Sequence, residues 1–356
     1  MRRLFLLFVL TILIISCIPT PTPEPIPPPK PTTNIGPNLL IDLQGEAKLH
    51  RDGWHEAYPV GIGTMIQFDD LLDVVGQADI LCGDLTPLKT VSGLDESSPC
   101  PRGAGWLEQN GAKYKAGIAS TTDIPYVEHP RHTLVLNQQP LLRWHDTGAN
   151  YTVMLMQGGQ VVWLQDDVVG HELRYPNRDL LPGQDYLLLV IDKNTGKSSK
   201  EDPERGLGFR LVSQAERAEI ETKQAKIDQL TFPNEAMHDF TLAVHYASWQ
   251  GDNDWGLWSE AQLLLESLDP ADNAPAIHLW QGDISRNMRL RLEAETAYQL
   301  ALQQADSLGD QETQAAAHFG LWQTSGDESH CQTAIELYGK LGDQQQAEWV
   351  EQNCKE

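Results

Sequence analysis

The chain has 356 residues and carries 26 lysines and arginines against 50 aspartates and glutamates. Its formal net charge of −24 makes nucleic acid a poor partner, because phosphate binding requires a positively charged footprint. The acidic surface favours solubility and repels anionic lipid. The length is sufficient for about two or three domains.

The N-terminal residues have the pattern of a bacterial secretory signal. Arg2 and Arg3 give a positive start, residues 4–15 are apolar, and Ile-Ile-Ser precedes Cys17. The apolar stretch is too short to cross a bilayer, which requires about 20 residues. The pattern resembles the signal and lipobox of bacterial lipoproteins. The resemblance implies that residues 1–16 are removed and that Cys17 carries the lipid. An ordinary signal peptide or a short membrane anchor is the alternative.

A proline-rich segment, residues 17–37, follows the signal. Proline favours the extended polyproline II conformation, which rises about 3.1 Å per residue. We therefore expect a stiff stalk on the order of 60 Å long, with a disordered linker as the alternative. The acyl anchor on Cys17 would insert into membrane lipid, and the stalk would hold the folded part away from the membrane. The expected location is extracytoplasmic, in the periplasm or at the cell surface.

Four cysteines remain besides the one at the lipobox, and outside the cytoplasm paired thiols are the usual state. Two lie early in the folded part and two lie near the C-terminus. The simplest of the possible pairings therefore joins Cys82 to Cys100 and Cys331 to Cys354. Zinc is the competing interpretation, but no CxxC or paired histidine spacing supports it.

Residues 38–120 are predicted to form a small β domain, because short apolar segments alternate with glycines. Residues 45–51, 59–60, 63–64, 69–72 and 80–83 resemble the FecR-type domain. That resemblance implies a small all-β fold. The expected strands are residues 40–43, 46–50, 64–66, 71–75 and 78–81.

Residues 124–212 show longer alternating strands. A Gly-Gly pair at residues 158–159 predicts a tight hairpin, because both turn positions take positive φ. Residues 181–186, just before an apolar strand, resemble the tyrosine corner of fibronectin type III and immunoglobulin (Ig)-like sandwiches. The resemblance implies that the Tyr186 hydroxyl binds upstream backbone and that Trp144 fills the core.

After residue 213 the composition becomes rich in alanine, leucine, glutamate and glutamine, which predicts helices. Residues 213–235 read as a charged helical connector. Residues 236–356 contain a repeated helix in which Ala261, Ala294 and Ala334 occupy equivalent positions. Small residues at these positions let helices approach closely, so the repeat favours a stacked array.

The middle repeat unit carries the most specific pattern. Gly282, Ala294, Tyr298 and Ala301 have the spacing of the tetratricopeptide (TPR) repeat, and the units resemble that family. The resemblance implies a short α-helical solenoid with a concave surface for peptides or proteins. A lone helical bundle is the alternative.

The TPR resemblance also implies which side chains contact a partner, because the first helix of each pair lines the groove. The candidates are His245, Trp249, His278, Gln281, His318 and Gln323. An array that only packs against its neighbouring domains is the alternative. A glycan site is a second interpretation of Trp249, Trp255 and Trp258, although tryptophan in a helical repeat is more often core.

No catalytic fingerprint occurs in the sequence. Glu128, His129 and His132 lie in what reads as a proline-flanked linker. Residues 192–196 fit a hairpin turn better than a calcium loop. We therefore expect no cofactor, no metal and no enzymatic activity.

Together these patterns predict a multidomain β + α protein. Two small all-β domains, FecR-like and then Ig-like, precede an α-helical TPR-like solenoid. The predicted function is protein–protein interaction or scaffolding at the cell envelope, with an envelope protein docking on residues 236–353. The alternatives are a glycan- or peptidoglycan-binding module and a sensor that relays a ligand signal to a membrane partner.

Overall fold

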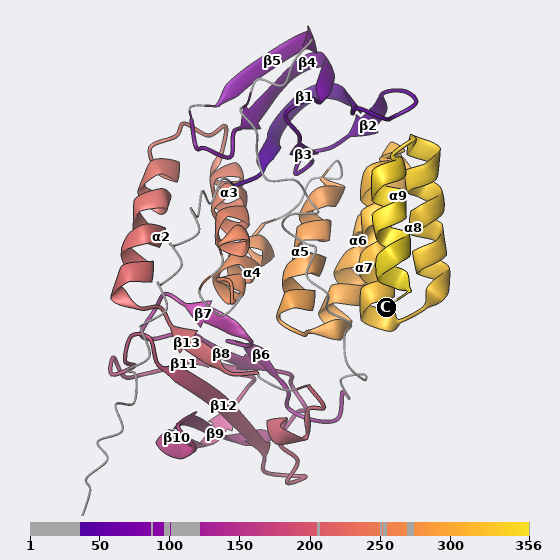
Figure 1. Ribbon diagram of the computed structural model, residues 1–356. Helices are drawn as coiled ribbons and strands as arrows, with labels where there is room; N and C mark the ends of the chain where they lie inside the picture. The colour runs from indigo at the N-terminus through magenta and orange to yellow at the C-terminus, as the bar shows by residue number, and fades with distance from the viewer. Residues whose placement is uncertain are drawn as a thin grey trace, which may run out of the picture. The chain divides into compact units, whose positions relative to one another are not determined.

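Figure 1 shows the computed structural model of the chain. It describes residues 36–86, 88–95, 100, 122–204, 207–249, 251, 255–268 and 274–355, which all belong to the folded unit Ile35–Glu356. Cys17, the expected signal and almost all of the proline-rich segment lie outside the described residues. The lipidation of Cys17 therefore stays a prediction.

The first sheet is antiparallel, with five strands among the described residues. Its strands are β1 (Asn38–His50), β2 (Tyr58–Val60), β3 (Met65–Ile66), β4 (Leu71–Leu81) and β5 (Lys89–Asp95). β1 and β4 lie in the middle of the order β2-β1-β4-β5, and β3 pairs with the start of β1 (Figure 1). Leu72, Val74, Ala78 and Ile80 of β4 are buried. These four side chains point to the same face of β4, two before and two after Gly76. One face of the sheet is therefore buried.

The prediction that β1 and β4 are each divided at a glycine is wrong. The two strands pair along their whole length, with Gly45 opposite Gly76. Both glycines have positive φ, and a Cβ on either one would collide with the backbone carbonyl of the opposite strand. They therefore allow a close approach inside a continuous pair of strands and do not end them.

The second β region forms two sheets. Its strands are β6 (Val127–His129), β7 (Thr133–Val135), β8 (Leu141–Trp144), β9 (Asn150–Gln157), β10 (Gln160–Val169), β11 (Glu172–Arg174), β12 (Asp185–Asp192) and β13 (Phe209–Leu211), with a 3-10 turn η1 (Ser199–Glu201). The sheet orders are β10-β9-β12-β13-β7 and β11-β8-β6. The fully buried Trp144 and Tyr151 lie in the core of this region.

Two local predictions for this region are confirmed. β9 and β10 form a hairpin around Gly158 and Gly159, which both have positive φ. The hydroxyl of Tyr186 accepts a hydrogen bond from the backbone N–H of Leu181 at 2.7 Å. This bond fixes the turn that leads into β12.

Eight helices follow among the described residues. They are α2 (Gln214–Ile227), α3 (Glu235–Ser248), α4 (Trp258–Glu266), α5 (Pro275–Asn287), α6 (Arg291–Leu308), α7 (Gln311–Ser325), α8 (Glu328–Leu341) and α9 (Gln344–Cys354). Consecutive helices from α5 to α9 pack against one another (Figure 1). Asp310, Asp327 and Asp343 cap α7, α8 and α9, each with its carboxylate accepting a backbone N–H. The coarse prediction of β sheets followed by helices is confirmed.

Tyr298 of α6 is the central side chain of the helical array. It is fully buried, and its hydroxyl donates to Asp283 of α5 at 2.8 Å. Its ring lies where a Cβ on Gly282 of α5 or Gly320 of α7 would be. Three successive helices therefore approach one another around one aromatic ring, because two of them carry glycine there.

The four cysteines form the two predicted pairs. Cys82 pairs with Cys100 at a Cα–Cα distance of 5.2 Å, and Cys331 pairs with Cys354 at 6.4 Å. The second pair joins α8 to α9 and closes the end of the array. Within the described ranges, no helix has the length and apolar character needed to span a bilayer.

The first sheet shares its core with the helices. Leu40, Leu49 and Leu72 belong to one buried cluster with residues of α5 to α9, and Leu39 and Ile41 belong to another with residues of α2 to α5. The sandwich has a separate core of its own. Burial of apolar surface therefore fixes the first sheet on the array.

Candidate functional site

Arg51, just after β1, anchors the first sheet to the helices through a buried ion network. Its Nε and Nη2 donate to Asp70 at 2.9 and 3.0 Å, and Nη2 also donates to the carbonyl of Met65 at 3.1 Å. Its Nη1 donates to Glu312 in the first turn of α7. The Arg51 side chain is 7% exposed and that of Asp70 is 1% exposed. Buried charges of this kind are tolerated only when they are paired.

A second set of contacts joins the loop after β1 to the turn between α8 and α9. The indole Nε1 of Trp54 donates to Asp343 at 3.3 Å, and the backbone N–H of His55 donates to the carbonyl of Leu341 at 2.8 Å. The first sheet thus occupies the edge of the array formed by the N-termini of α7 and α9.

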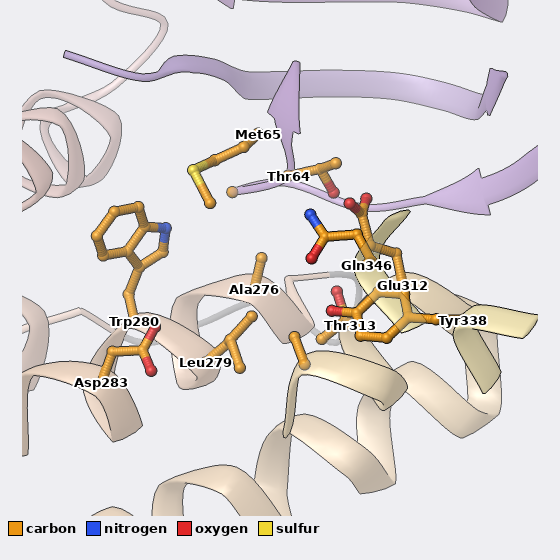
Figure 2. Close-up of a pocket in the computed structure, with 12 residues that line it drawn as sticks. Thr64, Met65, Ala276, Leu279, Trp280, Asp283, Glu312, Thr313, Tyr338 and Gln346 are labelled. Atoms are coloured by element: carbon orange, nitrogen blue, oxygen red, sulfur yellow. The ribbon is translucent and has the colours of Figure 1, made fainter. Parts of the chain in front are cut away.

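A narrow slot lies beneath this junction, between the strand region and the helices (Figure 2). Its volume is about 30 Å³, which is enough for roughly two water molecules. Thr64 and Gln346 line it, and Thr64 Oγ1 and Gln346 Oε1 are buried without a hydrogen-bond partner among the described residues. Bound water satisfies such atoms, so the slot suits water and is too small for a sugar or a peptide.

A larger cavity, of about 280 Å³, lies where β6 and β8 of the sandwich face α4 and α6. We call it the carboxylate cavity, because Glu128, Glu266 and Glu293 line it together with Arg143. Arg143 donates to both carboxylate oxygens of Glu266, at 2.6 and 2.8 Å, and pairs with Glu128 at 3.2 Å. The single guanidinium is therefore shared by two of the three carboxylates.

The rest of the lining of the carboxylate cavity contains both polar and apolar side chains. The hydroxyl of Tyr126 donates to Glu293 at 2.8 Å. Gln262 of α4 lines the cavity, is 7% exposed, and forms a side-chain hydrogen bond with the buried His129. Leu290 adds an apolar surface, and His171 completes the lining. Each carboxylate of the cavity therefore has a donor: Arg143 for Glu128 and Glu266, and Tyr126 for Glu293.

Burial controls the electrostatics of this cavity. It raises the pKa of Glu128 to about 7, helped by the negative charge of Glu293 and opposed by Arg143. Burial and the positive charge of Arg143 together lower the pKa of the adjacent His129 to about 3, and a hydrogen bond with Gln262 opposes them. His129 is therefore neutral in the folded protein near neutral pH.

Burial of neutral His129 makes its contribution to stability depend on pH. As pH falls below about 6.5, the unfolded chain binds a proton at His129 that the folded protein does not bind. The contribution of His129 should therefore fall by about 2 kcal/mol between pH 7 and pH 5, whereas the raised pKa of Glu128 acts in the opposite direction. Urea unfolding at both pH values checks this, with His129→Gln expected to reduce the pH dependence. The matched variant His171→Gln, at an exposed histidine, should not reduce the pH dependence. An equal effect of both variants would contradict the assignment of the pH dependence to His129.

Three of the six residues predicted to line a partner groove are buried. Trp249, His278 and Gln323 are 3%, 8% and 5% exposed, so they present little surface to a partner. His245, Gln281 and His318 are half-buried. The six lie on α3, α5 and α7 or next to them. Whether the half-buried three bind a partner stays a prediction.

The tryptophans considered for a glycan site lie mainly in the core. Trp249 and Trp258 are 3% and 6% exposed and belong to the buried cluster of α2 to α5. Trp255 is half-buried, and the ring of His132 packs against both Trp255 and Trp258 at 5.3 and 5.7 Å between ring centroids. Trp249 and Trp258 therefore expose little ring surface for stacking on a sugar, and a glycan contact at Trp255 stays a prediction.

The sequence interpretation missed the carboxylate cavity. Glu128 and His129 were assigned to a linker, which is wrong, because they lie on β6 and pair with β8. The shortness of this segment between prolines hid the strand, in which buried Val127 and His129 alternate with half-buried Glu128. Residues 192–196 form a turn, in which Asp192 accepts the backbone N–H groups of Asn194 and Thr195.

Comparison with known proteins gives no assignment, since no protein-family model and no curated protein matches the chain.

Proposed function

We propose that the chain is a lipid-anchored, extracytoplasmic scaffold that binds a basic protein of the cell envelope. The lipobox-like residues before Cys17 support the location, as do the two cysteine pairs, because disulfides persist outside the cytoplasm. In this proposal the helical array holds the β modules, and one β module carries the docking surface.

The finer fold assignments form part of the proposal. The hydrogen bond from Leu181 to Tyr186 supports an Ig-like sandwich with a tyrosine corner. The packing of Gly282 and Gly320 against Tyr298 supports a TPR-like array. The paired long strands β1 and β4 are consistent with a FecR-like sheet.

The proposed docking surface rests on a group of exposed apolar side chains. Five apolar side chains form neighbouring rows on the outer face of the β10-β9-β12 sheet, and we call them the outer patch. They are Met154, Met156, Val161, Leu164 and Leu187. Val161, Leu164 and Leu187 are 51%, 53% and 38% exposed.

The outer patch is unusual for its position. The outer face of an antiparallel sandwich is normally polar, and contiguous exposed apolar residues mark interaction sites. The register places Leu164 beside Met154 and Val161 beside Met156, whereas Val153 and Leu155 of β9 face the core. Val161 and Leu164 lie on the same outer face because the register of β10 against β9 shifts between Val161 and Trp163.

Charge favours a basic partner. The exposed Asp166 and Asp167 lie on β10 beside the outer patch, where both pair with Lys193, and the whole chain has a net charge of −24. A second copy would be repelled, whereas a protein with lysines or arginines around an apolar segment would be attracted. We therefore expect the occupant to be another, positively charged protein.

In-cell photo-crosslinking tests this proposal. A photo-reactive amino acid is placed at position 164 in the outer patch, at position 318 in the array, and at position 300. Leu300 is a matched control, because it is an apolar residue of α6 that is 41% exposed. We expect one defined basic protein to be captured at position 164 and not at position 300. Capture of that protein at position 318 instead, of a second copy, or of muropeptides alone would overturn the proposal.

A further inference from the structure

His318 of α7 and His330 of α8 form a close pair that protein docking at the outer patch does not use. Their Nδ1 atoms lie 2.8 Å apart, and their ring centroids lie 5.1 Å apart with the rings tilted by 37°. Both side chains are half-buried, so solvent reaches the pair. The pair joins two successive helices of the array.

The separation of the two nitrogens is close to that of two imidazole ligands on one metal ion. Metal–imidazole bonds of about 2.0–2.1 Å place two nitrogens about 2.9 Å apart at a right angle and about 3.3 Å apart in a tetrahedron. In a hydrogen bond between two imidazoles, one nitrogen donates and the other offers its lone pair. A metal ion replaces the shared proton and accepts the lone pairs of both nitrogens. The pair therefore needs only small movements of its rings to hold an ion.

The backbone that carries both histidines is fixed by neighbouring residues. Phe319, which follows His318, is fully buried. Cys331, which follows His330, is bonded to Cys354 of α9. Ligands on packed elements of this kind are held near the binding geometry before the ion arrives.

Local charge favours a cation at the pair. α7 contains no lysine or arginine, and the single one on α8 is Lys340, in the last turn of that helix. His330 lies in the first turn, at the opposite end. The exposed Asp327, just before α8, lies close enough to His330 for their charges to attract. The two helices therefore place no positive side chain beside the pair.

We infer that His318 and His330 are the two protein ligands of a site for a divalent transition-metal ion, with Cu²⁺ preferred over Zn²⁺. Copper(II) favours tetragonal coordination, in which adjacent ligands lie at a right angle, and it binds nitrogen ligands more tightly than zinc does. No group of three or more His, Cys, Asp and Glu side chains in the described ranges could hold a metal ion, so water completes the coordination.

Metal was not expected from the sequence, because the two histidines are 12 residues apart and belong to different helices. Only the packing of α7 against α8 brings them together. The inference is independent of the proposed protein docking, since the outer patch lies on the sandwich.

Titration of the full chain in detergent micelles, treated with EDTA and then dialysed, tests the inference. The probes are CuCl₂ and ZnCl₂. We expect Cu²⁺ to bind with a Kd on the order of 1 µM and Zn²⁺ to bind at least about tenfold more weakly. Electron paramagnetic resonance of the copper-loaded protein should show coupling to two nitrogen ligands. Absence of copper binding, a spectrum without nitrogen ligands, or tighter binding of zinc would overturn the inference.

Variants locate the binding. His318→Gln and His330→Gln each remove one ligand, and each should weaken copper binding at least about tenfold. His171→Gln removes an exposed imidazole of the sandwich and should have no effect. Thermal melting without metal confirms that each variant is folded. A loss of affinity for only one of the two pair variants, or an equal loss for His171→Gln, would contradict a shared site.

Thermal melting with metal gives a second readout. Only the folded chain brings the two imidazoles together, so excess Cu²⁺ should raise the melting temperature of the wild type. It should raise that of His171→Gln equally and leave those of His318→Gln and His330→Gln unchanged. The same rise in all four proteins would show that copper binds elsewhere and would overturn the inference.

Discussion

Tyr298→Ala is expected to lower the free energy of unfolding by about 3–5 kcal/mol. The ring of Tyr298 fills the space between α5, α6 and α7 that Gly282 and Gly320 leave open. Its removal leaves a cavity where three helices meet, and it also removes the hydrogen bond to the buried Asp283. Both effects lower the free energy of unfolding. Urea unfolding followed by circular dichroism measures the change.

Two further variants separate the contributions of Tyr298. Tyr298→Phe keeps the ring and removes only the hydroxyl, so we expect a loss of about 1–2 kcal/mol. Leu300→Ala changes an exposed residue of the same helix and should change stability by no more than about 0.5 kcal/mol. A loss for Tyr298→Ala as small as that for Leu300→Ala would show that the ring does not hold the helices together.

Arg51→Met is expected to destabilise the protein by about 3–5 kcal/mol, because it leaves the carboxylates of Asp70 and Glu312 buried without their cation. Hydrogen–deuterium exchange should rise in β1 and in the first turn of α7. The stability change is measured by urea unfolding.

The matched control for Arg51→Met is Arg291→Met. Arg291 pairs with Glu295 at 2.7 Å on the surface of α6 and is 26% exposed. Surface pairs of this kind contribute about 0–1 kcal/mol. Equal losses for the two variants would contradict the buried anchor between the first sheet and the array.

Features that depend only on residues close together in the sequence could be predicted from it. The glycine pair at 158–159 required a tight turn, and Tyr186 required an upstream partner, so both were visible in the sequence. Gly45 and Gly76 were misread, because each looks like a strand end by itself. Their meaning depends on their being opposite one another, which only the pairing of β1 with β4 provides.

The sites depend on contacts between distant segments, which the sequence does not display. Arg51 meets Glu312, and Glu128 faces Glu293, only after the sheets pack on the helices. For the same reason the exposure of Trp249 and His278 was not predictable from their place in a repeat. The outer patch was overlooked, because apolar residues on both faces of β9 and β10 read simply as strands.

Docking of a basic protein on the outer patch is tested most directly by affinity measurements. The purified crosslinked partner is titrated with three proteins: wild type, Leu164→Lys and Leu300→Lys. A lysine at position 164 places a charge in the middle of the patch, so we predict binding at least about tenfold weaker than wild type. Leu300→Lys adds the same charge elsewhere and should bind like wild type. Equal affinities of the two variants would contradict docking at the outer patch.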